Sequence, residues 1–455
     1  MTEATKLLSH IYNACDPLAP ATPEYYVNCA EARGSSAFTL QFKQQLARVE
    51  SGNFLQCLFS GHIGCGKSSE LKRLEHDLET SSRPYFPVYV SASDYLDEND
   101  VVPSDILLAV VAKLAESMRG KAGIDLKPTY FQKRFDELKN TLLSEVGVSE
   151  IGIGAGDVKA TLQLSKKDPG FRAMVRDKLG RQTSTLLGEI NLVLDQARAE
   201  LRTAATAQNG VYYEDIVLIL DQLERIQRVE GWEDGAKSQK HLFIECAPQL
   251  KGLNVHVIYT IPLRLVRSHG PELGKIYRSA PFVLPMIKIF ERGAKRKPYA
   301  SGIDCMKDLV RRRLGGASLE DVFGPGALDW LITYSGGHVR DLMTFIREAS
   351  AYTDHLPINL DIAKKALQQT IALYSTSIPN GFWPKLVELE LSTDQHIDNN
   401  DPDYQTMLEQ VYVMEYINGD DDSDPFMSAA PWYAVNPIVR ELRQFKDALH
   451  VAKKQ

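Results

Sequence analysis

One stretch near the N-terminus constrains the fold more than any other, the run FLQCLFSGHIGCGKSSELKRL over residues 54–74. Apolar residues predict a buried strand that stops at Ser60, and a helix-forming segment opens with Ser69. Between them Gly61–Ser68 reads G-x-x-x-x-G-K-S. Glycines let successive backbone N–H groups curl round an anion, and a helix N-terminus adds the positive end of its dipole. A strand, the complete motif and a helix in succession predict a nucleotide-binding P-loop.

The chemistry of the loop assigns a role to each of its residues. The ammonium of Lys67 would lie on the β- and γ-phosphates of ATP, and the hydroxyl of Ser68 would ligate Mg²⁺. The same residues could form a glycine-rich strand-to-helix turn without a ligand, but the full motif in its setting favours ATP and Mg²⁺. The predicted nucleotide-binding residues of the loop are Gly61, His62, Ile63, Gly64, Cys65, Gly66, Lys67, Ser68 and Ser69.

Length and composition indicate an ordinary globular protein of two or three domains. The chain has 455 residues, of which 44% are hydrophobic and 24% charged, enough for several buried cores. No apolar run approaches the ~18 residues of a membrane span, and the N-terminus lacks the pattern of a signal peptide. The six cysteines are scattered without C-x-x-C pairs, which predicts a reducing cytoplasm and neither a zinc site nor a disulfide framework.

The net charge of −7 is unevenly distributed along the chain. From Ile358 to the end there are 8 Lys and Arg against 15 Asp and Glu, which accounts for the whole imbalance. A dedicated nucleic-acid binder usually carries a basic excess on its reading domain. The acidic C-terminal part therefore weighs against such a role.

Strands and helices alternate through the first two thirds of the chain. Strand patterns at residues 54–60, 85–90, 215–221 and 255–259 are separated by helical patterns at 104–118, 170–207 and 238–250. This alternation predicts a doubly wound α/β core with a parallel sheet. Alternating residues with three glycines over residues 149–165 predict a β-hairpin insertion in that core.

The chain around this core divides by composition into three further parts. Residues 1–36 form an N-terminal arm, in which Tyr26 or Val27 either covers the adenine or packs on the core. Residues 37–284 form the ATPase core, and residues 285–355 a small helical lid. Residues 356–455 combine three helices with two strands and an acidic turn, a winged-helix-like pattern.

The second signature is LILDQLER, at residues 218–225. An apolar strand that ends in Asp221 is where P-loop proteins place the carboxylate that orients Mg²⁺, although a buried strand ending in an N-cap aspartate has the same pattern. Hydrolysis also needs a carboxylate near the γ-phosphate to polarise water. Gln222 follows Asp221 and cannot take a proton, so Glu224 is the nearer candidate and slow hydrolysis is expected.

Two further residues are candidates for contact with the γ-phosphate. Thr260 ends the strand after that of Asp221 and either binds the phosphate or attacking water, or begins an ordinary turn. The run SGGHVRD opens a helix whose first turn carries Arg340. An arginine there can reach the β/γ-phosphates, or can be an exposed residue after a Gly-Gly turn. The predicted catalytic set is Lys67, Asp221, Glu224, Thr260 and Arg340, with Ser68 and Asp221 at the metal.

These motifs together resemble the AAA+/STAND side of the P-loop ATPases, with Orc/Cdc6-like proteins and predicted ATPases of bacterial anti-phage systems as the most similar groups. The resemblance rests on the P-loop, D-x-x-E, the strand-end threonine, G-G-x-x-R and the winged helix, over residues 25–445. It implies that Thr260 is sensor 1 and Arg340 sensor 2. Ordinary AAA+ motors have Glu where this chain has Gln222, so the resemblance favours a switch over a processive motor.

The resemblance also implies oligomers in which an arginine reaches into a neighbouring site. The candidates are Arg292, Arg296 and Arg311–Arg313, and their spacing does not choose among them. We expect a regulatory ATPase that assembles and controls a separate effector protein, in a setting such as anti-phage defence. The alternative is an ATPase that loads on or remodels DNA through its winged helix. A small-molecule kinase would leave the lid and winged helix without a role.

Overall fold

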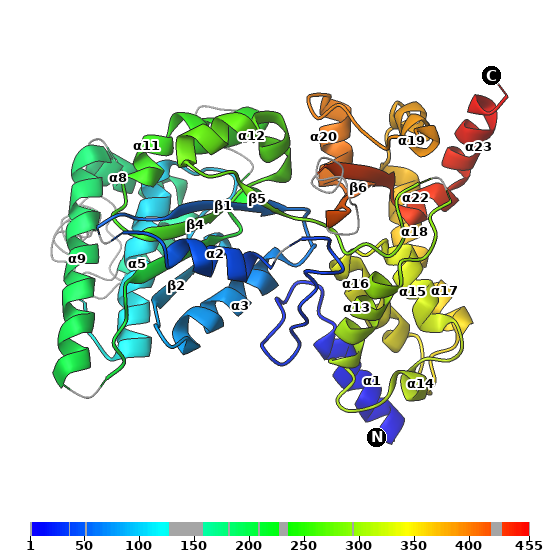
Figure 1. Cartoon of the computed structure of the whole chain (residues 1–455), viewed down its shortest axis with the longest axis horizontal. Helices are drawn as coiled ribbons and strands as arrows, with labels where there is room; N and C mark the ends of the chain where they lie inside the picture. Colours follow the sequence, from blue (N-terminus) through cyan, green and yellow to red (C-terminus); the bar gives the residue numbers. More distant parts are fainter. Residues whose placement is uncertain are drawn as a thin grey trace. The chain divides into compact units, whose positions relative to one another are not determined.

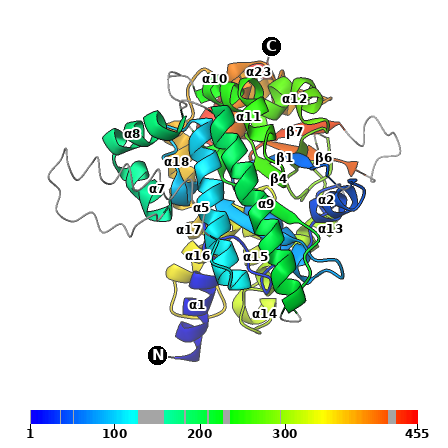
Figure 2. The ribbon, with the colours of Figure 1, turned by 90° about the vertical axis from the view of Figure 1, so that its left-hand side faces the viewer.

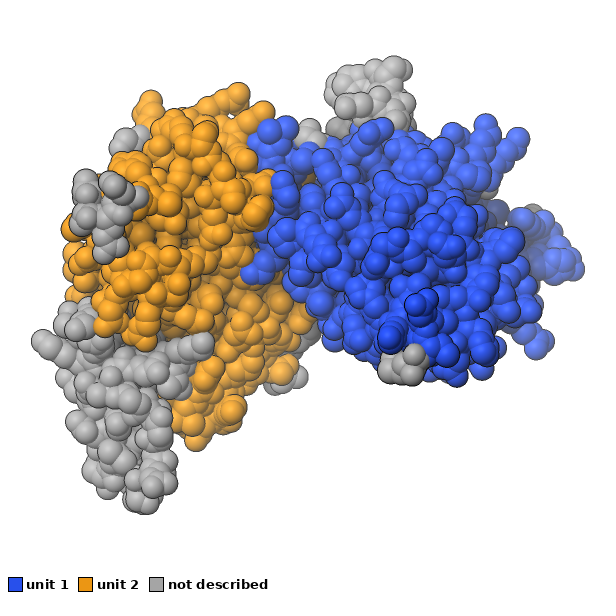
Figure 3. Space-filling model, turned by 90° about the horizontal axis from the view of Figure 1, so that it is seen from below, with its two compact units in different colours: residues 1–41, 61–73, 283–455 blue, residues 42–60, 74–282 orange. Residues whose placement is uncertain are grey.

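The computed structural model describes residues 2–35, 37–50, 52–126, 158–180, 183–207, 210–226, 235–293, 295–419 and 430–454. The chain divides into two compact units (Figure 3). Unit 1 comprises residues 1–41, 61–73 and 283–455, and unit 2 comprises residues 42–60 and 74–282. The P-loop segment thus clusters with the N-terminal arm and the C-terminal half of the chain. The domain boundaries drawn from the sequence stay a prediction.

A five-stranded sheet with the order β2-β3-β4-β1-β5 forms the centre of the α/β core. Its strands are β1 (Gln56–Gly61), β2 (Phe86–Ser91), β3 (Ile216–Asp221), β4 (His256–Thr260) and β5 (Phe282–Leu284). The pairs β1/β4, β2/β3 and β3/β4 are parallel. All residues of β3 and β4 are buried, as expected for strands covered on both faces. The predicted α/β class with a parallel sheet is confirmed.

Helices cover both faces of this sheet, with α12 (Leu263–Tyr277) above and α2 (Phe38–Leu46) below the strands in Figure 1. On the outside, α5 (Pro103–Ala122) packs against α9 (Thr183–Ala207), as Figure 2 shows. The other elements of the core are α3 (Lys67–Thr80), α4 (Ala92–Tyr95), α8 (Pro169–Gly180), η1 (Leu223–Arg225), α10 (Gly235–Lys240), η2 (His241–Glu245) and α11 (Ala247–Lys251).

One local prediction in this region is wrong, and one predicted helix is present in pieces. Of the expected β-hairpin, residues 149–157 lie outside the described residues, and Val158–Lys167 is the helix α7. Its buried side chains Leu162 and Ser165 are three residues apart, on one helical face. The short alternating pattern could not exclude this, because brief apolar runs fit either structure. The helix expected over 238–250 is divided among α10, η2 and α11.

Unit 1 begins with α1 (Glu3–Ala14) and continues, after the P-loop segment and residue 283, into a group of helices. These are α13 (Ala300–Arg311), α14 (Leu319–Val322), α15 (Ala327–Ser335), α16 (Val339–Ala351) and α17 (Leu360–Ala366). The arm helix α1 packs against α16. The predicted helical lid is therefore built together with the N-terminal arm.

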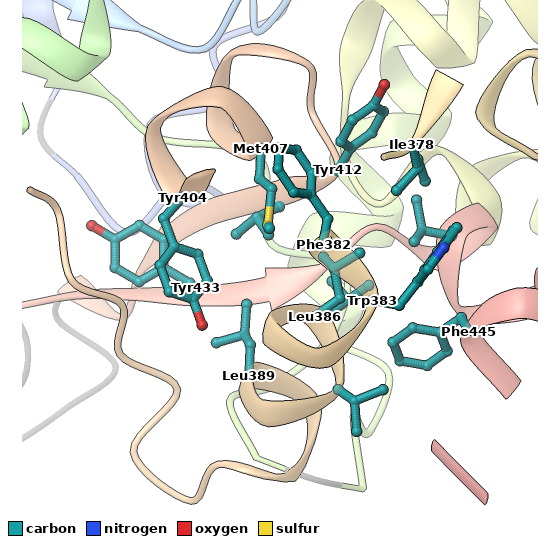
Figure 4. Packing of buried hydrophobic residues seen from close by; sticks show 14 of the residues in the cluster. Ile378, Phe382, Trp383, Leu386, Leu389, Tyr404, Met407, Tyr412, Tyr433 and Phe445 are labelled. Carbon is teal, nitrogen blue, oxygen red and sulfur yellow. The ribbon is translucent and has the colours of Figure 1, made fainter. Parts of the chain in front are cut away.

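The C-terminal region has the winged-helix-like arrangement expected from the sequence. Its elements are α18 (Gln368–Ser377), α19 (Phe382–Leu391), α20 (Pro402–Glu409), the antiparallel pair β6 (Val413–Ile417) and β7 (Pro431–Val435), α22 (Pro437–Glu441) and α23 (Arg443–Ala452). A buried cluster that includes Trp383, Met407, Tyr433 and Phe445 joins α19, α20, β7 and α23 (Figure 4). Because each element contributes large side chains to this core, the region forms one packed body.

Among the residues that the structure describes, none of the helices has the length and apolar character needed to cross a membrane.

Candidate nucleotide-binding site

The backbone of the P-loop takes a shape that its glycines permit. The φ angles of Gly61, Gly64 and Gly66 are 152°, 82° and 109°, in the region where other residues are strained. A Cβ on Gly64 would lie 2.5 Å from Nε2 of His338, so a larger residue does not fit there. The glycines that the motif requires therefore serve both the curl of the loop and its close packing.

Lys67 begins α3 and is almost fully buried. Its Nζ donates hydrogen bonds to the carbonyl oxygens of Gly61 at 3.1 Å and His62 at 3.0 Å. The ammonium therefore lies within the curl of the loop, at the end of α3 where an anion is attracted by the helix dipole. This is the position that the sequence predicts for the phosphate-binding cation.

The first turn of α16 is bonded directly to the P-loop. The backbone N–H of Arg340 donates to the carbonyl of Gly64 at 3.2 Å. The ring of His338, at the N-cap of α16, bonds through Nε2 to the carbonyl of Ile63 at 2.7 Å. The side chain of Arg340 donates from Nε to the carbonyl of Pro17 at 3.2 Å. The structure thus brings the backbone of Arg340 to the P-loop, and its guanidinium bonds to the N-terminal arm. A contact of this guanidinium with the phosphates stays a prediction.

The N-terminal arm lies along the P-loop and the start of α3. The hydroxyl of Tyr26 donates to Glu70 at 3.0 Å, and the N–H of Ala21 donates to Oγ of Ser69 at 2.9 Å. Burial is the largest influence on the pKa of both the Tyr26 phenol and the Glu70 carboxyl, and it raises both. Whether Tyr26 or Val27 covers an adenine stays a prediction, but Tyr26 does reach the P-loop helix.

Sequence reasoning missed Arg33, a buried residue of the same arm. Its guanidinium donates to the carbonyl of Cys65 at 2.7 Å and to that of Pro285. The cation is therefore held against the backbone of the P-loop at Cys65. An isolated arginine before Gly34 carries no motif, so the sequence offered no signal for this contact.

The side chain of His62 has a role that the P-loop motif does not contain. The ring is buried; its Nδ1 bonds to the carbonyl of Leu408 at 3.1 Å, and its Nε2 accepts from the N–H of Glu415 at 3.0 Å. An acceptor at Nε2 leaves the proton on Nδ1, which fixes one neutral tautomer. Burial lowers the pKa of His62 to about 4, with opposing contributions from Glu415 and supporting ones from His338 and Lys67.

The acidic motif lies in unit 2, where β3 ends. Asp221 is fully buried, its Oδ2 accepts from the hydroxyl of Tyr89 on β2, and its Oδ1 accepts from the N–H of Gln222 at 2.8 Å. Gln222 has a φ of 69°, and its side-chain oxygen accepts from the hydroxyl of Ser91 at 3.4 Å. The carboxylate of Asp221 is thus held by two donors. The amide side chain that follows it, that of Gln222, is held by Ser91.

The turn after Asp221 is fixed by Thr260. Its hydroxyl accepts from the N–H of Leu223 at 3.0 Å, and the residue is fully buried at the end of β4. Glu224 lies within the short helix η1, three residues after Asp221. Thr260 therefore holds the segment that carries Glu224, which is the role of an ordinary turn residue. A further contact of Thr260 with a phosphate stays a prediction.

The residues present fit a nucleotide with Mg²⁺. Three glycines with positive φ give the loop its curl, Lys67 supplies a buried cation, and Ser68 follows it at the start of α3. The P-loop follows β1 and the carboxylate of Asp221 ends β3, with β4 between them in the sheet. Mg²⁺ binds few protein ligands and keeps water and phosphate oxygens, which suits a hydroxyl such as that of Ser68. A contribution of Asp221 to the same metal site stays a prediction.

Solved structures resemble this chain in their overall architecture. The match to an Aeropyrum pernix Orc1 protein in complex with DNA has 13% identity and a TM-score of 0.35, and covers 93% of this chain and 96% of the other. The match to a Walker-type ATPase of Pyrococcus abyssi has 12% identity and a TM-score of 0.42, and covers 96% of this chain and 99% of the other. The match to a Cdc6 protein of Pyrobaculum aerophilum has 10% identity and a TM-score of 0.40, and covers 97% of this chain and 98% of the other. This chain is similar to Orc/Cdc6-like P-loop ATPases.

A scan against protein-family models finds no match, and a search of curated proteins finds none either. All three TM-scores are below 0.5, so the functional argument rests on the strand order, the P-loop and the side-chain contacts of this chain.

Several basic residues that could contact DNA or a neighbouring subunit have internal partners within unit 1. Arg296 pairs with Glu390 at 2.6 Å and donates to the carbonyl of Val435. Lys288 bonds to the carbonyl of Asn418 at 2.8 Å. Arg313 bonds to the carbonyls of Ala14, Tyr25 and Leu309. Lys288 and Arg313 are buried, so they hold the fold together rather than present charge to a partner.

Proposed function

We propose that this chain is an ATP-binding switch that hydrolyses ATP slowly, assembles with nucleotide and acts on a separate partner protein. The observation that carries the proposal is the direct bonding of the P-loop to α16 through the N–H of Arg340 and the ring of His338. A ligand that changes the P-loop must change its contacts with the lid. A change of contacts between two states is what a ligand needs to shift an equilibrium.

Slow hydrolysis is supported by the residues after Asp221. The side chain of Gln222 is an amide, which can orient water but cannot accept its proton. Glu224 is then the carboxylate available to polarise water, one short turn further along. We expect Glu224→Gln to reduce turnover by a factor of about 10²–10⁴, the usual contribution of a general base, and to retain the ATP-bound assembly.

The test uses the purified full chain. Mass photometry with ATP, ADP and no nucleotide should show a larger species with ATP, and Lys67→Ala should abolish it. Glu320→Gln, on α14, is the matched control for Glu224→Gln and should behave as the unaltered chain. A mass that ignores ATP, or a steady-state turnover above tens per second, would contradict the switch.

The alternative function is loading on or remodelling of DNA, which the Orc1 structure in complex with DNA makes worth testing. Here α20, the helix that precedes the β6/β7 pair, reads PDYQTMLE and contains no Lys or Arg. Asp401 and Asp403 at its start pair with Lys385 at 2.5 and 2.7 Å. This acidic helix favours a protein partner over phosphate.

Fluorescence anisotropy with a labelled duplex at several salt concentrations separates the two functions. Binding whose affinity falls steeply with salt would establish phosphate contacts and would make DNA the target. For a protein partner, affinity capture of the tagged chain from its native cells with ATP and with ADP should yield a nucleotide-dependent companion. Loss of phage resistance on deletion of the gene would place that companion in anti-phage defence.

A further inference from the structure

We propose that His62 couples occupancy of the P-loop to the winged-helix-like region, through the two hydrogen bonds of its ring to α20 and β6. The inference rests on the proposed nucleotide binding and names the regulation of that same site. It concerns only residues of unit 1.

The first link of the coupling is the carbonyl of His62. It accepts a hydrogen bond from Nζ of Lys67 at 3.0 Å, and the carbonyl of Gly61 accepts another at 3.1 Å. A bound polyphosphate competes for the same ammonium, because Lys67 is the cation that the P-loop offers to phosphate oxygens. When Nζ turns toward phosphate, the His62 carbonyl loses this donor and its peptide is freer to reorient.

The second link is the ring of the same residue. Its Nδ1–H donates to the carbonyl of Leu408 in the last turn of α20, and its Nε2 accepts from the N–H of Glu415 in β6. The ring is fully buried, so water does not replace either bond if it breaks. A reorientation of the His62 peptide therefore acts directly on α20 and β6.

The third link is the packing of α20. Met407 and Leu408 belong to the buried cluster shown in Figure 4, together with residues of α19, β7 and α23. Because these elements share one core, α20 cannot shift without them. The carbonyl of Glu415 also accepts from the N–H of Met286 at 3.2 Å. Glu415 is thus held at both its backbone groups by residues outside the β6/β7 pair.

Hydrogen exchange of the full chain, read on peptides that cover α20 and β6, tests the coupling. With saturating ATP and Mg²⁺ we expect exchange of the Glu415 amide to rise by about threefold or more, because its acceptor is weakened. Inorganic tripolyphosphate with Mg²⁺ should give the same change, since the signal is the phosphate at Lys67. No change in the unaltered chain when nucleotide is bound would overturn the inference.

His62→Gln tests the ring itself. The glutamine amide can keep one of the two hydrogen bonds but not both at the spacing of the ring nitrogens. The difference in exchange between nucleotide-saturated and nucleotide-free protein should therefore fall to less than half of its value in the unaltered chain. His256→Gln is the matched control: it is also a buried histidine whose ring accepts a backbone N–H, that of Leu55, but it lies on β4 in unit 2. The control should retain the response at α20 and β6. An equal loss in both variants would contradict a specific role of His62.

Nucleotide binding is measured separately, by anisotropy of a fluorescent ATP analogue. Absence of binding in the unaltered chain would refute the proposed function. Binding without an exchange change at α20 and β6 would refute only the coupling. If His62→Gln does not fold, the tripolyphosphate experiment on the unaltered chain still decides the question.

Discussion

The hydroxyl of Tyr89 on β2 donates a hydrogen bond to Oδ2 of Asp221 at the end of the neighbouring strand β3. The register of the two strands pairs Ser91 with Asp221, so Tyr89 lies two residues earlier on β2 and its ring reaches forward to the carboxylate. Both residues are buried. The tyrosine orients the carboxylate that we assign to Mg²⁺, a positioning role that the acidic motif alone does not reveal.

Tyr89→Phe should lower the free energy of unfolding by about 1–3 kcal/mol, because a buried carboxylate loses a donor. It should also raise the Mg²⁺ concentration needed for half-maximal ATP binding, since the carboxylate is no longer held in one orientation. Urea unfolding and a Mg²⁺ titration measure the two effects. Tyr85→Phe, just before the same strand, should leave the Mg²⁺ requirement unchanged. Equal Mg²⁺ curves for both variants would rule out the positioning role.

Gly64→Ala should abolish nucleotide binding and destabilise the protein by more than about 2 kcal/mol. The φ of 82° strains any other residue, and the added Cβ would lie 2.5 Å from His338 Nε2 and 2.8 Å from Arg340 Cβ. Gly381→Ala is the control, because a Cβ there meets no atom within 4 Å. Thermal unfolding and ATP-analogue binding measure both. Normal binding of the ATP analogue by Gly64→Ala would contradict the close fit between the P-loop and α16.

Stability should fall as the pH falls from about 6.5 to about 4, because the pKa of His62 is lowered from 6.5 to about 4 by burial. In this window the unfolded chain binds the proton and the folded chain does not, so the loss approaches about 1.4 kcal/mol per pH unit. Above pH 6.5 the contribution of His62 is fully present.

The measurement compares unfolding free energies of the unaltered chain and His62→Gln across this window. The variant should show a shallower slope. Glu70, whose pKa is raised by burial, contributes a slope of opposite sign, but it is present in both proteins and cancels in the difference. His10→Gln, at an exposed position, should leave the slope as it is. Parallel curves for the unaltered chain and His62→Gln would contradict the buried neutral ring.

Arg296→Ala should destabilise unit 1 by about 2–4 kcal/mol, because it removes one of the two arginines that pair with the partly buried Glu390. Burial lowers the pKa of the Arg296 guanidinium to about 10, which indicates how far it is withdrawn from water. Arg311→Ala, at an exposed ion pair with Asp308, should change stability by less than about 0.5 kcal/mol. Chemical denaturation of the two variants checks this. Of these two arginines, only Arg311 then remains available to a neighbouring subunit. If Arg311→Ala loses ATPase activity and mixing with intact subunits restores it, Arg311 is the arginine that acts in the neighbouring site.

Much of the α/β core could be predicted from local patterns of apolar residues in the sequence. The strand before the P-loop, the strand ending in Asp221 and the strand ending in Thr260 are short, strongly apolar runs bounded by polar residues, and the structure has a strand at each. Such runs specify buried strands because every position must be apolar. The β5 strand has three residues, too few to give a period, and it was not predicted.

The contacts that define the site could not be read from the sequence. Arg33 meets Cys65 across 32 positions, and His62 meets Leu408 and Glu415 across about 350. Each contact is made by one polar side chain to a backbone group, and backbone groups are the same at every residue. No residue type marks the partner in advance. Arg296, a candidate for reaching a neighbouring site, likewise pairs with Glu390 inside unit 1, and Lys288 is buried.

The small β6/β7 pair has a bonding pattern with a consequence for how partners attach. At β6 the N–H and C=O of Glu415 are taken by His62 and Met286, and at β7 the N–H of Tyr433 donates to the carbonyl of Gln395 at 2.8 Å. Strand addition, in which an extended peptide joins a sheet through its free edge, needs these same groups. At these positions the edges are closed. At these positions a partner, or a second copy of the chain, cannot extend the sheet and would have to recognise side chains instead.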